Sequence, residues 1–302
     1  MIKIKSWFNA ARLRTLPLSV SGVIVGTSLA NFYGYNDSTI FFLAILTTIG
    51  FQITSNFAND YGDGVKGTDN EDRIGPKRAL QSGLLSRKEL KSGIIVSIIV
   101  SFLLVIALVY SAFEMDNLLN PVLFIILGVA SIWAAIRYTV GSSAYGYKGL
   151  GDIFVFLFFG LLSVLGSMFL FTKHFEPLAI LPAITFGLLS TAVLNLNNLR
   201  DNESDKKSKK YTMVVKMGFA RGKMYHYSLL IVAFVCMVLF VGFNYTHWKN
   251  VIVLTGFIPI FLHLKKVQKI KAPILLDPEL KKIALTTFLI AVLFYIAFNN
   301  FL

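Results

Sequence analysis

Residues 40–69 read IFFLAILTTIGFQITSNFANDYGDGVKGTD, an apolar stretch that ends in carboxylates, amides and glycines. Its first part, residues 40–58, is long and apolar enough to cross a bilayer as an α-helix. Carboxylates at membrane depth are costly and mark functional sites where they occur. The stretch therefore predicts a membrane-spanning helix with a functional site at its C-terminal end.

The composition extends this prediction to the whole chain. Of the 302 residues, 55% are hydrophobic and 15% are charged, and the mean hydropathy is +0.67. Soluble domains contain roughly 25% charged residues, so the chain has the composition of a membrane protein. Cys236 is the only cysteine, which excludes a disulfide framework within the chain and a cysteine-based metal site.

Apolar windows predict an all-α polytopic membrane protein with nine transmembrane helices. The eighth window is short, and we expect the first to be retained as a helix rather than removed as a signal peptide. The candidate spans are 16–33, 40–58, 93–112, 120–137, 150–171, 178–198, 225–243, 250–264 and 283–301.

Basic residues are concentrated on alternate connections between these spans. The N-terminal segment, the three segments 59–92, 137–149 and 199–224, and the loop 265–282 hold 27 of the 29 Lys and Arg residues. The remaining two are Lys173 and Lys249. The positive-inside rule then predicts a cytoplasmic N-terminus and an external C-terminus. The net charge of +13 is therefore explained by topology, and a nucleic-acid partner is excluded.

Two acidic clusters follow spans that run towards the predicted cytoplasmic side. The first acidic cluster is Asn56, Asn59, Asp60 and Asp63, whose spacing places all four on one helix face. The second acidic cluster is Asn195, Asn198, Asp201 and Asp205, again close to one stripe. A carboxylate at a helix C-terminus is destabilised by the helix dipole, and a bound divalent cation reverses that effect.

The ligand types predict which cation binds. Oxygen ligands without His or Cys favour a hard ion, and Mg²⁺ typically uses one or two carboxylates together with substrate phosphates. Taken alone, one such cluster would be interpreted as solvated loop residues at a membrane boundary. Two clusters of matching character on one side favour a paired site.

The spacing of the clusters also suggests how the chain is organised. We expect a single domain over residues 1–302. The clusters follow the second and the sixth span and so lie four spans apart, which fits a parallel repeat of about 1–140 and 141–282 followed by a last helix at 283–301.

Basic residues accompany the carboxylates and are candidate phosphate ligands. Arg forks and Lys ammonium groups bind phosphate oxygens, although topology alone accounts for many of them. The candidates for a diphosphate are Arg14, Lys66, Arg78, Lys148 and Lys210.

The clusters resemble a known family. Two aspartate-rich motifs on the second and sixth of nine helices are similar to those of the UbiA-type intramembrane prenyltransferases. Asn59, Asp60 and Asp63 match the first three positions of the family motif Asn-Asp-x-x-Asp-x-x-x-Asp, but Gly67 stands at the last position. "RLRTLPLS" near the start and "YKGLGD" at 147–152 also look like family segments.

The departure at Gly67 is typical of one branch. The stretch "NDYGDGVKGTDNEDRIGPKRALQSG" closely resembles the polyprenyltransferases that act on 1,4-dihydroxy-2-naphthoate in menaquinone synthesis. Its matching positions are Gly67, Asp69, Arg73 through Pro76, Arg78, Gln81 and Gly83. The second motif of that branch is matched by Asp201, Asp205, Lys210 and Thr212.

The resemblance implies nine helices around a central cavity, Mg²⁺, a polyprenyl diphosphate donor and 1,4-dihydroxy-2-naphthoate as acceptor. Asp60 and Asp63, helped by Asn56 or Asn59, would hold one Mg²⁺, and Asp201 and Asp205 a second, so these four aspartates are the expected catalytic residues. Further candidate substrate contacts are Asn56, Asn59, Asp69, Arg73, Gln81, Tyr147 and Asn198. The expected location is the cytoplasmic membrane, with the site facing the cytoplasm.

Other functions fit parts of the pattern. Within the superfamily the acceptor could be 4-hydroxybenzoate, haem or a chlorophyll precursor, which the Gly67-x-Asp69 ending argues against. A secondary transporter also uses intramembrane carboxylates, but it should place them near the bilayer midplane. A non-catalytic lipid-binding scaffold would not need two metal-binding motifs. The aromatic run "IFVFLFFG" at 153–160 could line a cavity or face lipid.

Overall fold

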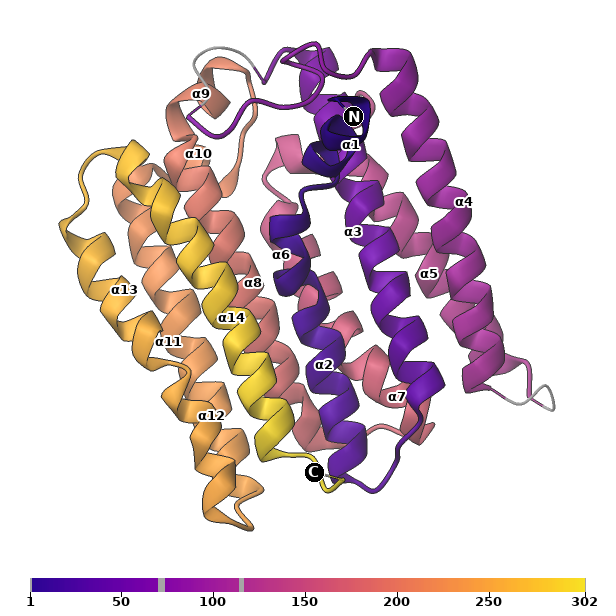
Figure 1. Ribbon diagram of the computed structural model, residues 1–302. Helices are drawn as coiled ribbons and strands as arrows, with labels where there is room; N and C mark the ends of the chain where they lie inside the picture. Colours follow the sequence, from indigo (N-terminus) through magenta and orange to yellow (C-terminus); the bar gives the residue numbers. More distant parts are fainter. Residues whose placement is uncertain (1, 70–73, 114–116, 302) are drawn as a thin grey trace.

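The computed structural model describes residues 2–69, 74–113 and 117–301. All regular elements in these ranges are helices, and nine spans among them are long and apolar enough to cross a membrane (Figure 1). The prediction of an all-α protein with nine spans is confirmed. The spans are Lys3–Phe32, Ser38–Lys66, Arg87–Ala112, Leu119–Arg137, Gly151–Thr172, Pro177–Arg200, Phe219–Phe243, Trp248–Lys269 and Pro273–Ala297.

Some spans are single helices and others are joined from shorter ones. Short helices α9 Asn202–Lys207 and α10 Met213–Met217 lie in the loop after the sixth span. Between α6 and α7, π-helical turns at Phe156–Gly166 complete the fifth span. The helices that build the spans are α1 Ile2–Ala11, α2 Leu16–Phe32, α3 Ser38–Lys66, α4 Arg87–Ala112, α5 Leu119–Arg137, α6 Gly151–Val155, α7 Ser167–Thr172, α8 Ile180–Arg200, α11 Phe219–Phe243, α12 Ile252–Thr255, α13 Ile258–Lys269 and α14 Asp277–Ala297.

The third span begins earlier than hydropathy alone predicts. Its helix α4 starts at Arg87 rather than near residue 93, because Ser86 and Glu89 form a capping box. The Ser86 Oγ accepts the Glu89 N–H at 3.2 Å, and a Glu89 carboxylate oxygen accepts the Ser86 N–H at 2.9 Å. A polar first turn is stable once its free N–H groups are satisfied in this way.

Two spans are interrupted. The short eighth window is a real span, but it breaks between α12 and α13, where Pro259 occupies the first turn of α13 and has no N–H to donate. The first span bends between α1 and α2 at Arg12, which has a left-handed backbone with φ 52°. This bend, called here the elbow, is one of the few positions where a residue other than glycine adopts that conformation.

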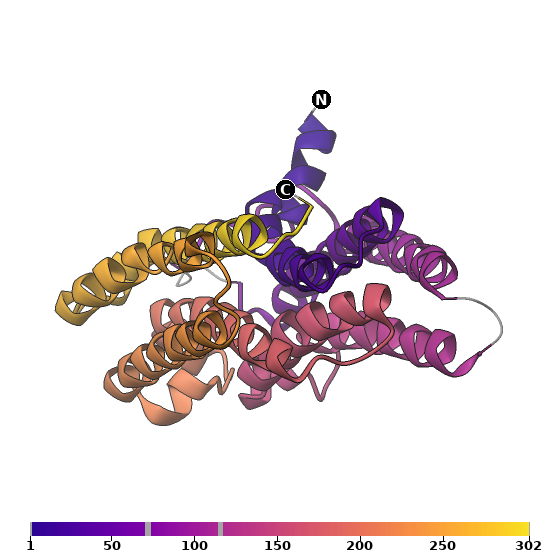
Figure 2. The same cartoon turned by 90° about the horizontal axis from the view of Figure 1, so that it is seen from below.

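The first and last spans close the bundle. Both views place α14 beside α2 (Figures 1 and 2). The Ser28 hydroxyl of α2 lies 3.1 Å from the Phe298 carbonyl oxygen, to which it donates. The rings of Phe294, Phe298 and Phe240 pack against one another in tilted and edge-to-face pairs, with centroids 4.8–5.4 Å apart.

Seen along their axes, the helices form two rows (Figure 2). One row contains α14, α2, α3 and α4, and the other contains α11, α8, the α6–α7 span and α5. The N-terminus lies at one end of the bundle and the C-terminus at the other (Figure 1). The end with the N-terminus also carries α9, α10 and the loop after α3, and is called here the polar end.

Candidate active site

A cavity of about 870 Å³ lies between the two rows of helices and reaches the polar end. This main cavity has two kinds of wall. Its polar part is lined by Arg12, Arg14, Asn56, Asn59, Asp63, Asp69, Arg78, Asn197, Arg200, Asp201, Asp205 and Lys210. Further from the polar end it is lined by apolar side chains that include Val105, Leu108, Val109, Phe124, Leu127, Phe158, Leu162 and Leu170.

The first acidic cluster occupies the last turns of α3. Asp63 lines the main cavity, and one of its oxygens accepts a hydrogen bond from the Tyr147 hydroxyl at 2.7 Å. Asp60 is buried and accepts the Ala79 N–H at 3.1 Å through Oδ2. Its Oδ1 is buried with no hydrogen-bond partner, and the side chain lines a smaller cavity of about 200 Å³ beside the main one.

Glycines allow the chain to pass closely around this cluster. A Cβ on Gly62 would lie 2.5 Å from the Thr139 hydroxyl, so only glycine lets residue 139 approach α3 here. Gly67 ends α3 with a left-handed backbone at φ 72°, and its N–H bonds to the Asp63 carbonyl. The chain therefore turns directly after the carboxylates, as the glycine-rich sequence suggested.

The two asparagines of the first acidic cluster have different surroundings. The Asn56 amide donates to the Ala11 carbonyl at 2.8 Å and to the Thr15 hydroxyl at 3.3 Å, and so ties the elbow to α3. Asn59 lines the main cavity, and its Oδ1 accepts from the Thr139 hydroxyl at 3.2 Å. Asn59 is thus placed to meet a ligand, whereas the Asn56 amide N–H groups already have partners.

The second acidic cluster does not lie on one helix. Asn198 belongs to α8 and is buried away from the main cavity, while its neighbour Asn197 lines that cavity. Helix α8 ends at Arg200, and the chain restarts as α9 at Asn202. Asp201 and Asp205 both line the main cavity.

Cations hold the carboxylates of the second cluster. The Arg200 guanidinium donates to both oxygens of Asp201, at 2.8 Å from Nε and 2.6 Å from Nη2. The Lys210 ammonium lies 3.8 Å from Asp205 Oδ1. Each carboxylate of this cluster therefore has a cationic partner.

Lys210 also joins the two clusters. Its buried ammonium lies 4.0 Å from Asp63 Oδ2 as well as 3.8 Å from Asp205. Burial alone would lower the pKa of Lys210, but Asp63 and Asp205 outweigh it and raise the pKa well above its ordinary value. The two clusters therefore face each other across one ammonium group.

Tyr147 lies beside this ammonium. The Lys66 ammonium is 3.9 Å from the Tyr147 ring centroid, and that of Lys210 is 5.5 Å away. The hydroxyl lies 2.6 Å from that of Thr68. Burial and the nearby Asp63 raise the pKa of Tyr147, so the phenol keeps its proton and donates it to the carboxylate.

The loop after α3 contributes further predicted residues. Arg78 lines both cavities, and its Nε lies 3.9 Å from Asp69 Oδ2 in the main cavity. Gln81 accepts the Arg78 backbone N–H at 3.2 Å and so orders this loop. Arg73 was predicted on the same loop and lies outside the described residues.

Three predicted cations differ in their access to the site. Arg14 is exposed at the rim of both cavities. Lys66 is exposed and reaches the site only through the Tyr147 ring. Lys148 is exposed and does not line the main cavity; its backbone carbonyl accepts from the Lys216 ammonium at 2.6 Å.

Arg12, Arg200 and Asp277 line the cavity but were not among the predicted site residues. Arg12 lies at the elbow and lines both cavities. Arg200 and Asp277 form an ion pair of 2.6 Å at the wall of the main cavity. The position of Arg200 directly before Asp201 is a signal that could have revealed it, whereas Arg12 and Asp277 depend on turns that the sequence does not specify.

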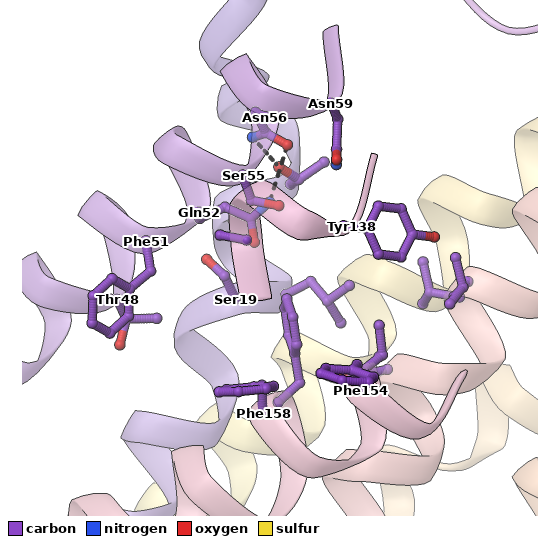
Figure 3. Close-up of a pocket in the computed structure, with 18 of the residues that line it drawn as sticks. Ser19, Thr48, Phe51, Gln52, Ser55, Asn56, Asn59, Tyr138, Phe154 and Phe158 are labelled. Atoms are coloured by element: carbon purple, nitrogen blue, oxygen red, sulfur yellow. Dashed lines mark hydrogen bonds between the residues drawn. The ribbon is translucent and has the colours of Figure 1, made fainter. Parts of the chain in front are cut away.

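Aromatic side chains form one wall of the main cavity. Tyr138, Phe154 and Phe158 face the same space as Ser19, Gln52, Ser55 and Asn56 (Figure 3). The Tyr145 and Phe154 rings stack at 3.9 Å, and the Phe154 and Phe158 rings at 6.2 Å. In the aromatic run at 153–160, Phe154, Phe158 and Phe159 line the cavity, and the exposed side chains are the aliphatic Ile153 and Leu157.

The donor set fits Mg²⁺ bound together with a diphosphate. Among the described residues, no three His, Cys, Asp or Glu side chains gather as a preformed metal site. Each cluster instead offers two carboxylates, and the unpartnered Asp60 Oδ1 is a buried oxygen suited to a cation. This matches the preference of Mg²⁺ for one or two carboxylates completed by substrate phosphates.

Comparisons with known proteins agree with this geometry. Residues 19–274 match the model of the UbiA prenyltransferase family. The chain is 44% identical to the 1,4-dihydroxy-2-naphthoate octaprenyltransferase of Haemophilus influenzae over 97% of this chain and 95% of that protein. It is 48% identical to the enzyme of the same name from Escherichia coli, over 79% of this chain and 77% of that one.

Solved structures share the fold. A UbiA homolog from Archaeoglobus fulgidus bound to GPP and Mg²⁺ superposes with a TM-score of 0.68, covering 97% of this chain and 99% of that one at 13% identity. The family match covers most of this chain, and the Haemophilus influenzae relative covers nearly all of it. The chain therefore belongs to the UbiA prenyltransferase family.

Proposed function

We propose that this protein transfers a polyprenyl group from polyprenyl diphosphate to 1,4-dihydroxy-2-naphthoate, with loss of CO₂ and diphosphate, to give demethylmenaquinol. The observation that carries the proposal is the pair of acidic clusters facing each other across Lys210 at the polar end of a cavity with apolar depths. The names of the two enzymes at 44% and 48% identity support the choice of acceptor.

The polar part of the cavity suits the diphosphate. Asp60, Asp63, Asp201 and Asp205, with Asn59, would hold Mg²⁺, which neutralises charge on the departing diphosphate when bound. Lys210, Arg78 and Arg12 add fixed positive charge at the same end of the cavity. Such preorganised charge stabilises a leaving group as negative charge develops on it.

The apolar part suits the prenyl chain. Breaking the bond between the allylic carbon and the diphosphate oxygen leaves an allylic cation, which water would destroy. The aromatic wall of Tyr138, Phe154 and Phe158 excludes water, and its π-faces stabilise positive charge. The remaining isoprene units would extend along the side chains of α4 and α5 that line the cavity.

The acceptor needs no external base. Its ring carbon that carries the carboxylate attacks the allylic cation, and a new carbon–carbon bond forms. The bond to the carboxylate then breaks, CO₂ leaves, and its electron pair restores the aromatic ring. The protein therefore has only to position the ring and keep water out.

We also infer the location. The distribution of basic residues indicates that the polar end faces the cytoplasm, in the cytoplasmic membrane. Polyprenyl diphosphate, an amphiphile of the bilayer, would enter from the membrane and the naphthoate from the cytoplasm. The position of the carboxylates at the ends of their helices argues against a transporter, which would place them at mid-membrane.

Competition between acceptors tests the proposal. The purified protein in nanodiscs is given equal 1,4-dihydroxy-2-naphthoate and 4-hydroxybenzoate, Mg²⁺, and donors of several chain lengths, and the products are weighed by mass spectrometry. We expect prenylated naphthoquinol lacking the carboxylate, abolished by EDTA and restored by Mg²⁺. Prenylated 4-hydroxybenzoate as the main product, or no product from either acceptor, would overturn it.

A further inference from the structure

The Arg200 guanidinium is unusual because three different side chains hold it. Besides its two bonds to Asp201, it donates to Asn197 Oδ1 at 2.8 Å and to Asp277 Oδ1 at 2.6 Å. The Arg200 side chain is only 4% exposed. Four of its five N–H groups are therefore engaged, and its plane is fixed at the wall of the main cavity.

This arrangement leaves Asp201 able to bind a cation. A carboxylate has about four lone-pair positions, and Arg200 uses one on each oxygen. The remaining positions are free of that bidentate contact, and Asp201 lines the main cavity. An Arg paired in this way fixes the direction in which those positions point, as hydrogen-bonded partners of metal ligands commonly do.

The third partner connects this pair to another helix. Asp277 is the first residue of α14, and its side chain is 46% exposed, in contrast to the buried Arg200. The following residues Pro278, Leu280, Lys281 and Ala284 line the main cavity. The same guanidinium thus links α8, which ends directly before Asp201, to the helix α14 that forms a side of the cavity.

We propose that Arg200 is a positioning residue for Asp201, and that Asp277 anchors it from α14, so that the two together set the affinity of the second acidic cluster for its divalent cation. The inference rests on the proposed function only in taking that cluster as a cation site. Arg200 contacts no reacting atom in this scheme. Lysine cannot replace it, because one ammonium cannot form the planar two-point contact.

The alternative is an ion pair that only stabilises the fold. Both readings predict that removing Arg200 lowers stability, because breaking a buried pair leaves a charge without compensation. The two interpretations predict different cation affinities for a variant that still folds. A stabilising pair would leave that affinity unchanged, whereas a positioning residue would not.

The test measures Mn²⁺, a paramagnetic substitute for Mg²⁺. Binding to the whole protein in nanodiscs is followed by electron paramagnetic resonance in the presence of inorganic pyrophosphate, with no donor or acceptor. Arg200→Lys should weaken Mn²⁺ binding by about 10- to 100-fold, the usual effect of losing a partner of a metal ligand. Asp277→Asn, which keeps one acceptor oxygen, should weaken it by a smaller factor.

A matched control and a second readout separate the outcomes. Arg221→Lys, at an exposed arginine of α11 away from the cavity, should bind as the wild type does. In transfer assays the Arg200 and Asp277 variants should need more Mg²⁺ but regain most of kcat at saturation. If Arg200→Lys does not fold, Asp277→Asn alone decides.

The inference is overturned if folded Arg200→Lys or Asp277→Asn binds Mn²⁺ with wild-type affinity, or if the wild type binds none. Failure of the proposed function has a different signature. A wild type that binds Mn²⁺ with pyrophosphate but makes no prenylated product would refute the reaction while leaving this inference standing.

Discussion

The two acidic clusters look alike in sequence but are held by different groups. In the first, Asp60 accepts a backbone N–H and Asp63 accepts a tyrosine hydroxyl, and Asp63 also lies 4.0 Å from the Lys210 ammonium that it shares with the second cluster. In the second, Asp201 and Asp205 face Arg200 and Lys210. A buried carboxylate whose hydrogen-bond partner is neutral keeps most of its charge unbalanced, so a bound cation has most to stabilise at Asp60. The second cluster is neutralised by the protein itself.

The largest difference should follow from removing one carboxylate from each cluster. Asp60→Ala and Asp201→Ala should each lower kcat/KM by about 10²–10³-fold, because each deletes a proposed ligand that stabilises the leaving group. Their stabilities should differ. Asp201→Ala leaves Arg200 partly unpaired and should lower the free energy of unfolding by about 3 kcal/mol. Asp60→Ala removes the unpartnered Oδ1 and the bond from the Ala79 N–H to Oδ2, but among the described residues it breaks no ion pair and should cost less, about 1–2 kcal/mol.

Activity assays with Mg²⁺ and thermal unfolding in detergent measure the two effects. Equal loss of stability in both variants would contradict the comparison. Near-normal activity in either variant would remove that aspartate from the site.

Lys210→Met should separate cation binding from catalysis. With the ammonium gone, Asp63 and Asp205 lose their shared positive partner, so Mn²⁺ binding without pyrophosphate should tighten by about tenfold, or 1.4 kcal/mol. Prenyl transfer should fall, because a positive charge near the diphosphate is lost. Paramagnetic resonance and product formation give the two readouts, and weaker Mn²⁺ binding would show that Lys210 does not compete with the cation.

Tyr147→Phe should have a moderate effect confined to the first cluster. The variant loses the 2.7 Å bond to Asp63, worth about 1–1.5 kcal/mol, so kcat/KM should fall roughly tenfold. Tyr211→Phe, at a tyrosine that is 52% exposed, is the matched control and should remain within about twofold of wild type. An unchanged Tyr147→Phe enzyme would mean that the phenol does not orient Asp63.

The smallest effect is expected from Lys148→Ala. Its side chain is exposed and lies outside the main cavity, so kcat/KM should stay within about twofold of wild type. A loss of more than tenfold, with unchanged unfolding temperature, would restore Lys148 as the phosphate contact that the sequence suggested.

Much of the fold could be predicted because the bilayer imposes length and composition on each span. The span boundaries were less certain where polar caps extend a helix, as at Ser86 and Glu89. The parallel repeat of about 1–140 and 141–282 stays a prediction.

The site was predictable where one helix carries the residues. Asn59 and Asp63 share the face of α3 that lines the cavity. Helical spacing does not predict the second cluster correctly, because α8 ends at Arg200. Residues after the break, such as Asp201, no longer follow the helical repeat of α8. Asn197 rather than Asn198 therefore faces the cavity. Arg12 depends on a left-handed elbow that no periodic pattern indicates.

The contact between the first and last spans has a consequence for how the protein is made. Spans enter the membrane in the order of synthesis. The Ser28 hydroxyl of α2 therefore has no carbonyl partners until α14 has been inserted. Until then Arg200 also lacks Asp277, and one side of the cavity lies open to lipid. We therefore expect insertion of the last span to complete the wall of the main cavity and to bring Asp277 to Arg200.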